Sequence, residues 1–265
     1  MFDSFGRKIH YLRISLTDRC NLRCRYCMPA EGVAWLPHER IMSLENMAKV
    51  AGAAAALGFD KIRLTGGEPL VRKGVPQFVT MLRDIPGLDI IAMTTNGTLL
   101  APLAADLARR GLSSVNISLD TVDPERYAYV TRGGRLDDAL CGIRAARDAG
   151  LPVKLNVVVD PSRDSRDLDG VRAFADELGC AVQTIRQYRL DQGKLDDFHY
   201  DRPPPCARCN RIRLLATGEL KPCLHGDAVV PVDLDDPAAS IRACVAMKPA
   251  HGGAASNHNV SAIGG

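Results

Sequence analysis

Three cysteines lie close together near the N-terminus, in the run TDRCNLRCRYC that follows the apolar stretch YLRISLT. Cys20, Cys24 and Cys27 have the spacing C-x3-C-x2-C. Three thiolates on one short loop can hold three irons of a [4Fe–4S] cubane and leave the fourth iron without a protein ligand. An open iron of this kind is a reaction site. A zinc knuckle fits less well, because structural zinc sites use four ligands and paired C-x2-C spacings.

A second set of cysteines lies near the C-terminus. Cys206, Cys209 and Cys223 have the spacing C-x2-C-x13-C. A zinc ribbon would need a fourth ligand, which His225 or Cys244 could supply. The other interpretation is a second three-cysteine iron–sulfur cluster with its own open iron. The spacing alone leaves both interpretations open.

Small and polar residues follow several predicted strands. Gly66-Gly67-Glu68-Pro69 follows the second strand, and its two glycines allow the backbone to approach a ligand closely. Thr95 and Asn96 end the third strand in the run TTNG, and Ser118 ends the fourth. Singly, each could be a turn or a helix cap. At successive strand ends they indicate a binding site.

The elements that must position these residues alternate along the chain. Apolar, β-branched runs predict strands near 11–17, 61–66, 89–96, 114–120, 153–160 and 181–188. Helical patterns lie between them, near 43–57, 74–85, 101–110, 136–149 and 166–178. Such alternation predicts an α/β fold with parallel strands and right-handed crossovers. Six units predict an open partial (β/α)6 TIM-like barrel, with the site at the C-terminal ends of the strands.

The pattern changes after Tyr188. Residues 189–205 are polar and end in three prolines, which predicts a linker. An apolar hairpin turning at Thr217-Gly218 and a helix near 236–247 follow. We therefore predict a barrel over 1–188 and an extension over 189–265.

The composition of the chain disfavours several classes of protein. The chain has 34 Lys and Arg against 31 Asp and Glu, a net charge of +3, which does not favour a nucleic-acid or membrane surface. No run approaches the ~18 apolar residues of a membrane span, and the N-terminus lacks the apolar core of a signal peptide. Nine cysteines without such signals predict a cytoplasmic protein whose clustered cysteines bind a metal or cofactor.

The runs that carry these residues resemble known sequences. LRISLTDRCNLRCRYCMP and KIRLTGGEPLVR resemble the cluster loop and GGEP motif of the radical S-adenosylmethionine (radical SAM) enzymes. CARCNRIR with TGELKPCL, and the terminal Ile263-Gly264-Gly265, resemble the GTP 3′,8-cyclase family of molybdenum-cofactor biosynthesis. TTNG, NISLD and KLNVVV match in the same order.

The resemblance implies two [4Fe–4S] clusters, S-adenosylmethionine and a radical SAM barrel with an auxiliary-cluster extension. The implied metal ligands are Cys20, Cys24, Cys27, Cys206, Cys209 and Cys223. The implied cofactor-binding residues are Tyr26, Gly66, Gly67, Glu68, Thr95, Asn96 and Ser118. The implied reaction converts GTP to (8S)-3′,8-cyclo-7,8-dihydroguanosine 5′-triphosphate, the first step of the pathway.

The resemblance also assigns roles to basic residues. Those implied to bind the triphosphate are Arg13, Lys61, Arg63, Lys154, Arg211 and Arg213. Those implied to assist cyclisation are Arg13, Arg186, Arg211, Arg213, Gly264 and Gly265. Guanidinium groups bind polyphosphate bidentately, and charged groups inside a barrel are costly without an anion. Surface charge is the alternative for Arg13, Lys61, Lys154, Arg211 and Arg213.

Three features depart from the family. Only residues 187–205 separate Arg186 from Cys206, Gln187-Tyr188-Arg189 replaces Phe-Ile-Glu, and His225 stands where an apolar or aromatic residue is expected. A relative acting on another nucleotide and a peptide-modifying radical enzyme are therefore alternatives, as is a non-enzymatic iron–sulfur scaffold. The resemblance further implies a flavodoxin or ferredoxin as electron donor and a downstream cyclic pyranopterin monophosphate synthase.

Overall fold

The computed structural model of the chain describes residues 1–160, 166–188, 190–196 and 199–255. Gly264 and Gly265, to which the resemblance gives a catalytic role, lie outside the described residues. So does Arg189.

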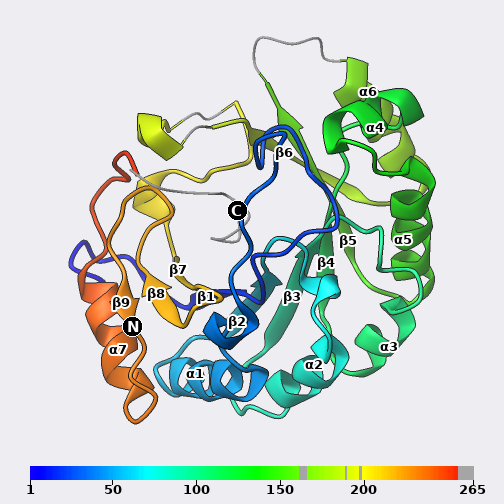
Figure 1. Cartoon of the computed structure of the whole chain (residues 1–265). Coiled ribbons are helices and arrows are strands. Elements are labelled where there is room, and N and C mark those ends of the chain that lie inside the picture. The colour runs from blue at the N-terminus through cyan, green and yellow to red at the C-terminus, as the bar shows by residue number, and fades with distance from the viewer. Residues whose placement is uncertain (161–165, 189, 197–198, 256–265) are drawn as a thin grey trace.

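Six parallel strands form the body of the fold, in the order in which they occur in the chain (Figure 1). They are β1 (Tyr11–Ser15), β2 (Lys61–Thr65), β3 (Ile90–Thr95), β4 (Ser114–Ser118), β5 (Val153–Val159) and β6 (Ala181–Arg186). The crossover helices are α1 (Leu44–Ala56), α2 (Val75–Arg83), α3 (Ala104–Arg109), α4 (Pro124–Thr131), α5 (Leu136–Asp148) and α6 (Arg166–Glu177). The predicted α/β class and open partial TIM-like barrel are confirmed.

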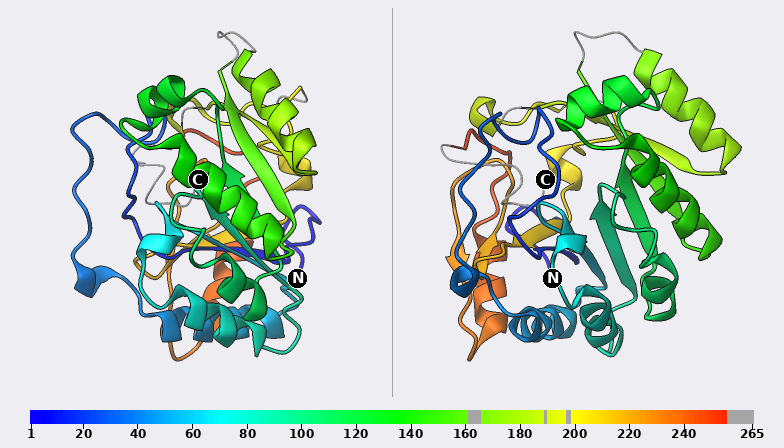
Figure 2. Two further views of the ribbon diagram at one scale, coloured as in Figure 1. Left: turned by 90° about the vertical axis from the view of Figure 1, so that its right-hand side faces the viewer. Right: turned by 45° about the vertical axis from the view of Figure 1, so that its right-hand side comes forward.

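The helices lie on the outside of the curved sheet and leave its inner face to the site (Figure 2). Alternation along the strands explains this division. Leu12 and Ile14 of β1 are fully buried in the apolar core, while Tyr11 and Arg13 line a cavity on the other face. Each strand therefore contributes one set of side chains to the core and the other to the barrel interior.

The C-terminal extension continues the same sheet. β7 (Arg211–Leu214) pairs in parallel with β1, and β8 (Glu219–Lys221) and β9 (Val230–Pro231) follow it antiparallel. β7 and β8 form the predicted hairpin, and α7 (Pro237–Ala246) is the predicted helix. The division at residue 188 stays a prediction, but the first strand of the extension completes the sheet beside β1.

Two local predictions need correction. The sequence analysis missed α4, although Asp123 and Pro124 mark its start: the Asp123 carboxylate accepts a hydrogen bond from the Arg126 backbone N–H at 2.7 Å. The stretch predicted as a linker is not a free connection, because residues 201 and 202 bond to β6. None of the helices in the described part of the chain is long and apolar enough to cross a membrane, and the cytoplasmic location stays a prediction.

Candidate active site

The three N-terminal cysteines lie together at the C-terminal ends of β1–β4. Cys20, Cys24 and Cys27 line one cavity, here called the cysteine-loop cavity. The other predicted cofactor residues that line it are Tyr26, Gly66, Gly67, Thr95, Asn96 and Ser118. The fold thus brings these residues from four segments of the sequence to one place.

Electrostatics around these thiols disfavour three free thiolates. Burial raises the pKa of Cys24 to about 12 and that of Cys27 well above its ordinary value, and neighbouring cysteines and Asp120 raise both further. Burial also raises the pKa of Cys20. A bound metal cation reverses this logic, because it stabilises deprotonated thiols. The three cysteines are only partly buried and line a cavity, which suits ligands of a metal cluster.

The two glycines of the GGEP run lie in close contact with the backbone at the start of the cysteine loop. A Cβ atom on Gly66 would lie 2.5 Å from the Thr17 carbonyl oxygen, and one on Gly67 only 2.3 Å from that of Arg19. Gly66 also has φ +147°. The Gly67 backbone N–H donates to the Thr17 carbonyl at 2.8 Å. The glycines let this turn pack directly against the base of the cysteine loop, in addition to lining the cavity.

Glu68 is not one of the described residues that line the cysteine-loop cavity. Its fully buried carboxylate accepts hydrogen bonds from the Thr95 hydroxyl at 2.7 Å, the Asn96 backbone N–H at 2.7 Å and the Leu70 backbone N–H at 3.0 Å. Glu68 therefore ties the end of β2 to the end of β3 and positions Thr95 and Asn96.

Tyr26 is fixed in a similar way. Its hydroxyl donates to the Asp120 carboxylate at 2.8 Å, and the other oxygen of Asp120 accepts from the Val158 backbone N–H at 2.8 Å. Burial raises the pKa of Asp120 to about 6. This places the Tyr26 ring beside the cysteines.

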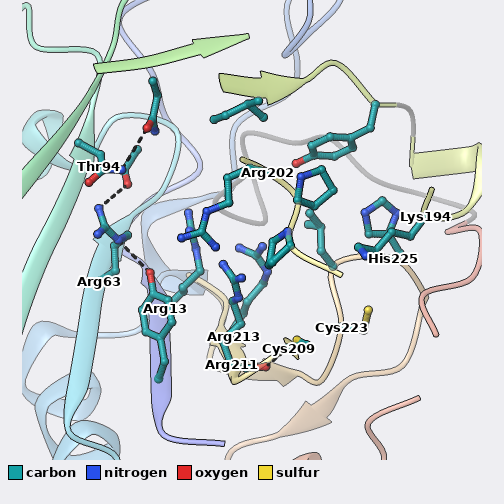
Figure 3. Close-up of a pocket in the computed structure, with 18 of the residues that line it drawn as sticks. Arg13, Arg63, Thr94, Lys194, Arg202, Cys209, Arg211, Arg213, Cys223 and His225 are labelled. Carbon is teal, nitrogen blue, oxygen red and sulfur yellow. Dashed lines mark hydrogen bonds between the residues drawn. The ribbon is translucent and has the colours of Figure 1, made fainter. Parts of the chain in front are cut away.

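A second cavity, here called the basic cavity, lies inside the barrel (Figure 3). It is lined by Cys206, Cys209 and Cys223 and by basic side chains from several segments. These are Arg13, Lys61, Arg63, Lys154, Lys194, Arg202, Arg211 and Arg213. No Asp or Glu occurs in the described part of this lining. Thr94, Asn156, Ile185 and Tyr188 line both cavities, so the two adjoin.

Strand register places the cations in two rows. Lys61, Tyr11 and Arg211 are aligned across β2, β1 and β7, and Arg63, Arg13 and Arg213 form the next aligned row on the same face. Strand alternation in the sequence predicts only that Arg211 and Arg213 share a face. The parallel pairing of β7 with β1 adds the partners on the neighbouring strands.

The neighbouring cations lower the proton affinity of Arg13. Burial, then repulsion from Arg213, Arg63 and Arg211, lowers the pKa of Arg13 to about 9. Cations of the same cavity favour the ionised form of the Tyr11 hydroxyl. Burial alone would raise its pKa, but Arg13, Arg63 and Arg211 lower it to about 7. Positive charge of this density, in a cavity whose described lining holds no Asp or Glu, attracts an anion.

The basic residues predicted from the sequence differ in their contacts and in the cavity that they line. Arg63 is held by the Tyr11 hydroxyl at 2.8 Å, the Met93 carbonyl at 3.0 Å and the Thr94 hydroxyl at 3.2 Å (Figure 3). Arg186 ends β6 and lines the cysteine-loop cavity, whereas the basic cavity's described lining does not include it. The side chain of Arg63 is therefore held in place by hydrogen bonds in the lining of the basic cavity. Arg186 belongs to the lining of the cysteine-loop cavity.

The second set of cysteines is braced by a buried lysine. The Lys248 ammonium donates to the Arg211 and Pro222 carbonyls at 2.8 Å each and lies 3.5 Å from the Cys209 sulfur. Burial alone would raise the pKa of Cys209, but Lys248 and Arg211 lower it below its ordinary value. A thiolate favoured in this way suits a metal ligand.

The two candidates for a fourth ligand differ. Cys244 is fully buried in the apolar core on α7 and does not occur in the described lining of the basic cavity. His225 lines that cavity, is 3% exposed, and neither ring nitrogen has a hydrogen-bond partner among the described residues. Its ring lies 5.4 Å from that of Tyr188. Burial lowers the pKa of His225 to about 4, so the imidazole is neutral.

Sequence reasoning missed four residues of the site. Lys194, Arg202 and Tyr188 line the basic cavity, and Lys248 supports it. Lys194 also pairs with Asp196. The first three lie in or beside the stretch predicted as a linker. The features that could have identified them are two basic residues and an aromatic residue, in or beside a stretch that was predicted only to connect two parts of the chain.

Comparisons with known proteins agree with this geometry. A profile of the Radical SAM superfamily matches residues 14–175. The chain is 41% identical over 306 aligned positions to the GTP 3′,8-cyclase of Moorella thermoacetica, covering 94% of each chain. It is 49% identical over 283 positions to that of Syntrophomonas wolfei, covering 85% of this chain and 83% of the relative. The first alignment is longer than the 265 residues of this chain, so that relative carries segments absent here.

Solved structures share the fold. Streptococcus suis SuiB bound to the precursor peptide SuiA has a TM-score of 0.65 at 13% identity, covering 83% of this chain and 60% of that one. Methylornithine synthase PylB has a TM-score of 0.56 at 16% identity, covering 69% and 55%. Identity this low supports the barrel architecture alone.

Proposed function

We propose a function from one premise: this chain belongs to the radical SAM superfamily and, within it, to the GTP 3′,8-cyclase family. The family implies a [4Fe–4S] cluster and S-adenosylmethionine. We infer that the chain converts GTP to (8S)-3′,8-cyclo-7,8-dihydroguanosine 5′-triphosphate. The observation that carries this proposal is the junction of the two cavities, one lined by the cysteine loop and the other by cations and a second set of cysteines.

The cysteine-loop cavity is the proposed cofactor site. Cys20, Cys24 and Cys27 would hold the [4Fe–4S] cluster, which together with S-adenosylmethionine would supply the radical chemistry. Thr95, Asn96 and Ser118 present hydroxyl and amide groups to the cofactor's polar ends. Glu68 acts through Thr95 and Asn96 rather than by contact, because its carboxylate is occupied by their hydrogen bonds.

The basic cavity is the proposed nucleotide site. Arg13, Arg211 and Arg213 bind the triphosphate, since guanidinium groups on adjacent strands can each donate two hydrogen bonds to phosphate oxygens. Lys61 and Lys154 add charge at the same wall. The anion offsets the repulsion that lowers the pKa of Arg13. Binding energy from this remote group orients the ribose toward the adjoining cofactor cavity.

The base is proposed to lie toward the second set of cysteines. Cys206, Cys209 and Cys223 supply three thiol donors around one part of the cavity, which fits a second [4Fe–4S] cluster. Tyr188, Leu224 and His225 lie on the same wall without charge. A planar purine can pack there while its phosphates face the arginines. Gly264 and Gly265 are proposed to reach this site.

The remaining proposals concern partners. A flavodoxin or ferredoxin supplies the electron for cofactor cleavage, and a cyclic pyranopterin monophosphate synthase consumes the product. Both rest on membership of the family.

The decisive experiment uses anaerobically reconstituted protein with S-adenosylmethionine, a reductant and a nucleotide panel, read by mass spectrometry. We expect 5′-deoxyadenosine and a cyclised product from GTP alone. A product from a different nucleotide would replace GTP as the substrate. Modification of a peptide with no reaction on any nucleotide would contradict the proposal.

A matched variant separates cofactor cleavage from cyclisation. Replacing Cys206, Cys209 and Cys223 by Ala is expected to leave some uncoupled 5′-deoxyadenosine formation and to remove the cyclised product. Stoichiometric zinc in the wild type, with no loss of iron in this variant, would instead identify a zinc site.

A further inference from the structure

Arg202 brings to the basic cavity a guanidinium that lies outside every motif shared with the family. We propose that Arg202 is a further substrate-binding residue, whose guanidinium contacts the polyphosphate end of the nucleotide. The identity of that anion as a nucleotide rests on the proposed function. The residue belongs to the short segment between β6 and the second set of cysteines.

The backbone around Arg202 is fixed to β6. The Arg202 N–H donates to the Thr184 carbonyl at 3.1 Å, and its carbonyl accepts from the Arg186 N–H at 3.0 Å. The Asp201 carboxylate accepts from the Thr184 backbone N–H at 2.8 Å and from its hydroxyl at 2.9 Å. Arg202 thus occupies a strand-like position at the edge of the sheet, as its bridge to Ile185 shows.

The side chain has no protein partner that would explain its place. No hydrogen bond or ion pair of the Arg202 guanidinium occurs among the described residues, and the Asp201 carboxylate is directed to Thr184. Burial, then repulsion from Arg211, lowers the pKa of Arg202. Holding a cation among cations has a cost that an anion removes.

The position of Arg202 complements the strand arginines. Figure 3 shows its side chain entering the cavity from the segment beside β6, toward the guanidinium groups of Arg13, Arg211 and Arg213. Those three come from β1 and β7. Four strands of the curved sheet lie between β6 and β1, and β7 is one strand further away. A phosphate chain between them would be bound from two sides. Pro203 and Pro204 follow Arg202 in the cavity wall and restrict its backbone.

The test compares nucleotide binding by reconstituted wild type, Arg202→Ala and Arg202→Lys. Titrations use GTP, GMP and inorganic tripolyphosphate as ligands. We expect Arg202→Ala to weaken GTP and tripolyphosphate binding about tenfold or more, and GMP binding much less. Arg202→Lys keeps the charge without the bidentate fork and should fall between. Arg242→Ala, on the exposed face of α7, is the matched control and should bind as the wild type does.

Cofactor cleavage without nucleotide shows that each variant is folded, because it depends on the other cavity. Equal affinity of Arg202→Ala and wild type for GTP and tripolyphosphate would overturn the inference and leave the proposed function intact. Conversely, tripolyphosphate binding that depends on Arg202, with no preference for GTP over other nucleotides, would support Arg202 and contradict the GTP assignment. A wild type that binds neither ligand would overturn both.

Discussion

The two adjoining cavities are built in different ways. The cysteine-loop cavity takes its residues from the cysteine loop and the ends of successive strands, and Arg186 is the one Arg or Lys in its described lining. The basic cavity takes its cations from β1, β2, β5, β7 and the segment before Cys206, and its described lining is densely cationic. The first is suited to a cofactor held by thiolates and neutral polar groups. The second, with many cations and no Asp or Glu in its described lining, is suited to an anion.

The sharpest test of this comparison removes the cysteine loop's ligands. The triple variant Cys20→Ala, Cys24→Ala and Cys27→Ala should lose 5′-deoxyadenosine formation entirely, because no open iron remains to bind the cofactor. Its iron content should fall from about eight to about four atoms per chain. Iron analysis and chromatography of the products measure both. Continued 5′-deoxyadenosine formation would show that the catalytic cluster lies elsewhere.

A second test asks whether repulsion between the cations of the basic cavity lowers the stability of the nucleotide-free protein while it favours GTP binding. Arg13→Met should weaken GTP binding about tenfold or more, the effect of losing a hydrogen bond to a charged group, ~1.5–3 kcal/mol. It should also raise the melting temperature of the nucleotide-free protein, by roughly 2–4 °C per kcal/mol of repulsion relieved. Calorimetry measures both changes. Arg83→Met, an exposed control paired with Asp84, should alter neither. A lower melting temperature for Arg13→Met would contradict the repulsion argument.

A third test uses Tyr11 as a reporter of the cavity's charge. Its pKa of about 7 means that the folded protein binds fewer protons than the unfolded chain between about pH 7 and 10. The stabilisation is therefore complete above pH 10 and is lost as pH falls through 7. Absorbance at 295 nm, wild type minus Tyr11→Phe, should show a tyrosine ionising near pH 7. GTP should move the midpoint upward. A midpoint near 10 without nucleotide would refute this.

The smallest effect concerns His225, a neutral side chain in the lining of the basic cavity. His225→Leu removes two ring nitrogens that have no partner among the described residues. If they contact the base, the KM for GTP should rise about fivefold, the usual value of one neutral hydrogen bond. Cofactor cleavage without nucleotide should be unchanged. The exposed His38→Leu serves as control. An unchanged KM would mean that His225 only packs against Tyr188.

The same contrast explains what could be predicted from the sequence. The six strands and the cysteine loop follow from local patterns, so most residues that line the cysteine-loop cavity can be predicted from the sequence. Local patterns do not reveal that the Glu68 carboxylate positions Thr95 and Asn96. The basic cavity depends on which strands pair. Nothing local in the sequence aligns Arg213 with Arg13, and nothing in a polar, proline-ended stretch reveals that Asp201 bonds to Thr184 and thereby directs Arg202 inward.

The pairing of β7 with β1 also has a consequence for the order in which the molecule folds. β1 lies near the start of the chain and its neighbour β7 near the end, so their contact is among the longest in sequence separation. During synthesis β1 remains an open edge, able to pair with another chain, until the second set of cysteines has been made. Ribosome-bound and truncated chains are therefore the forms of this protein most exposed to aggregation.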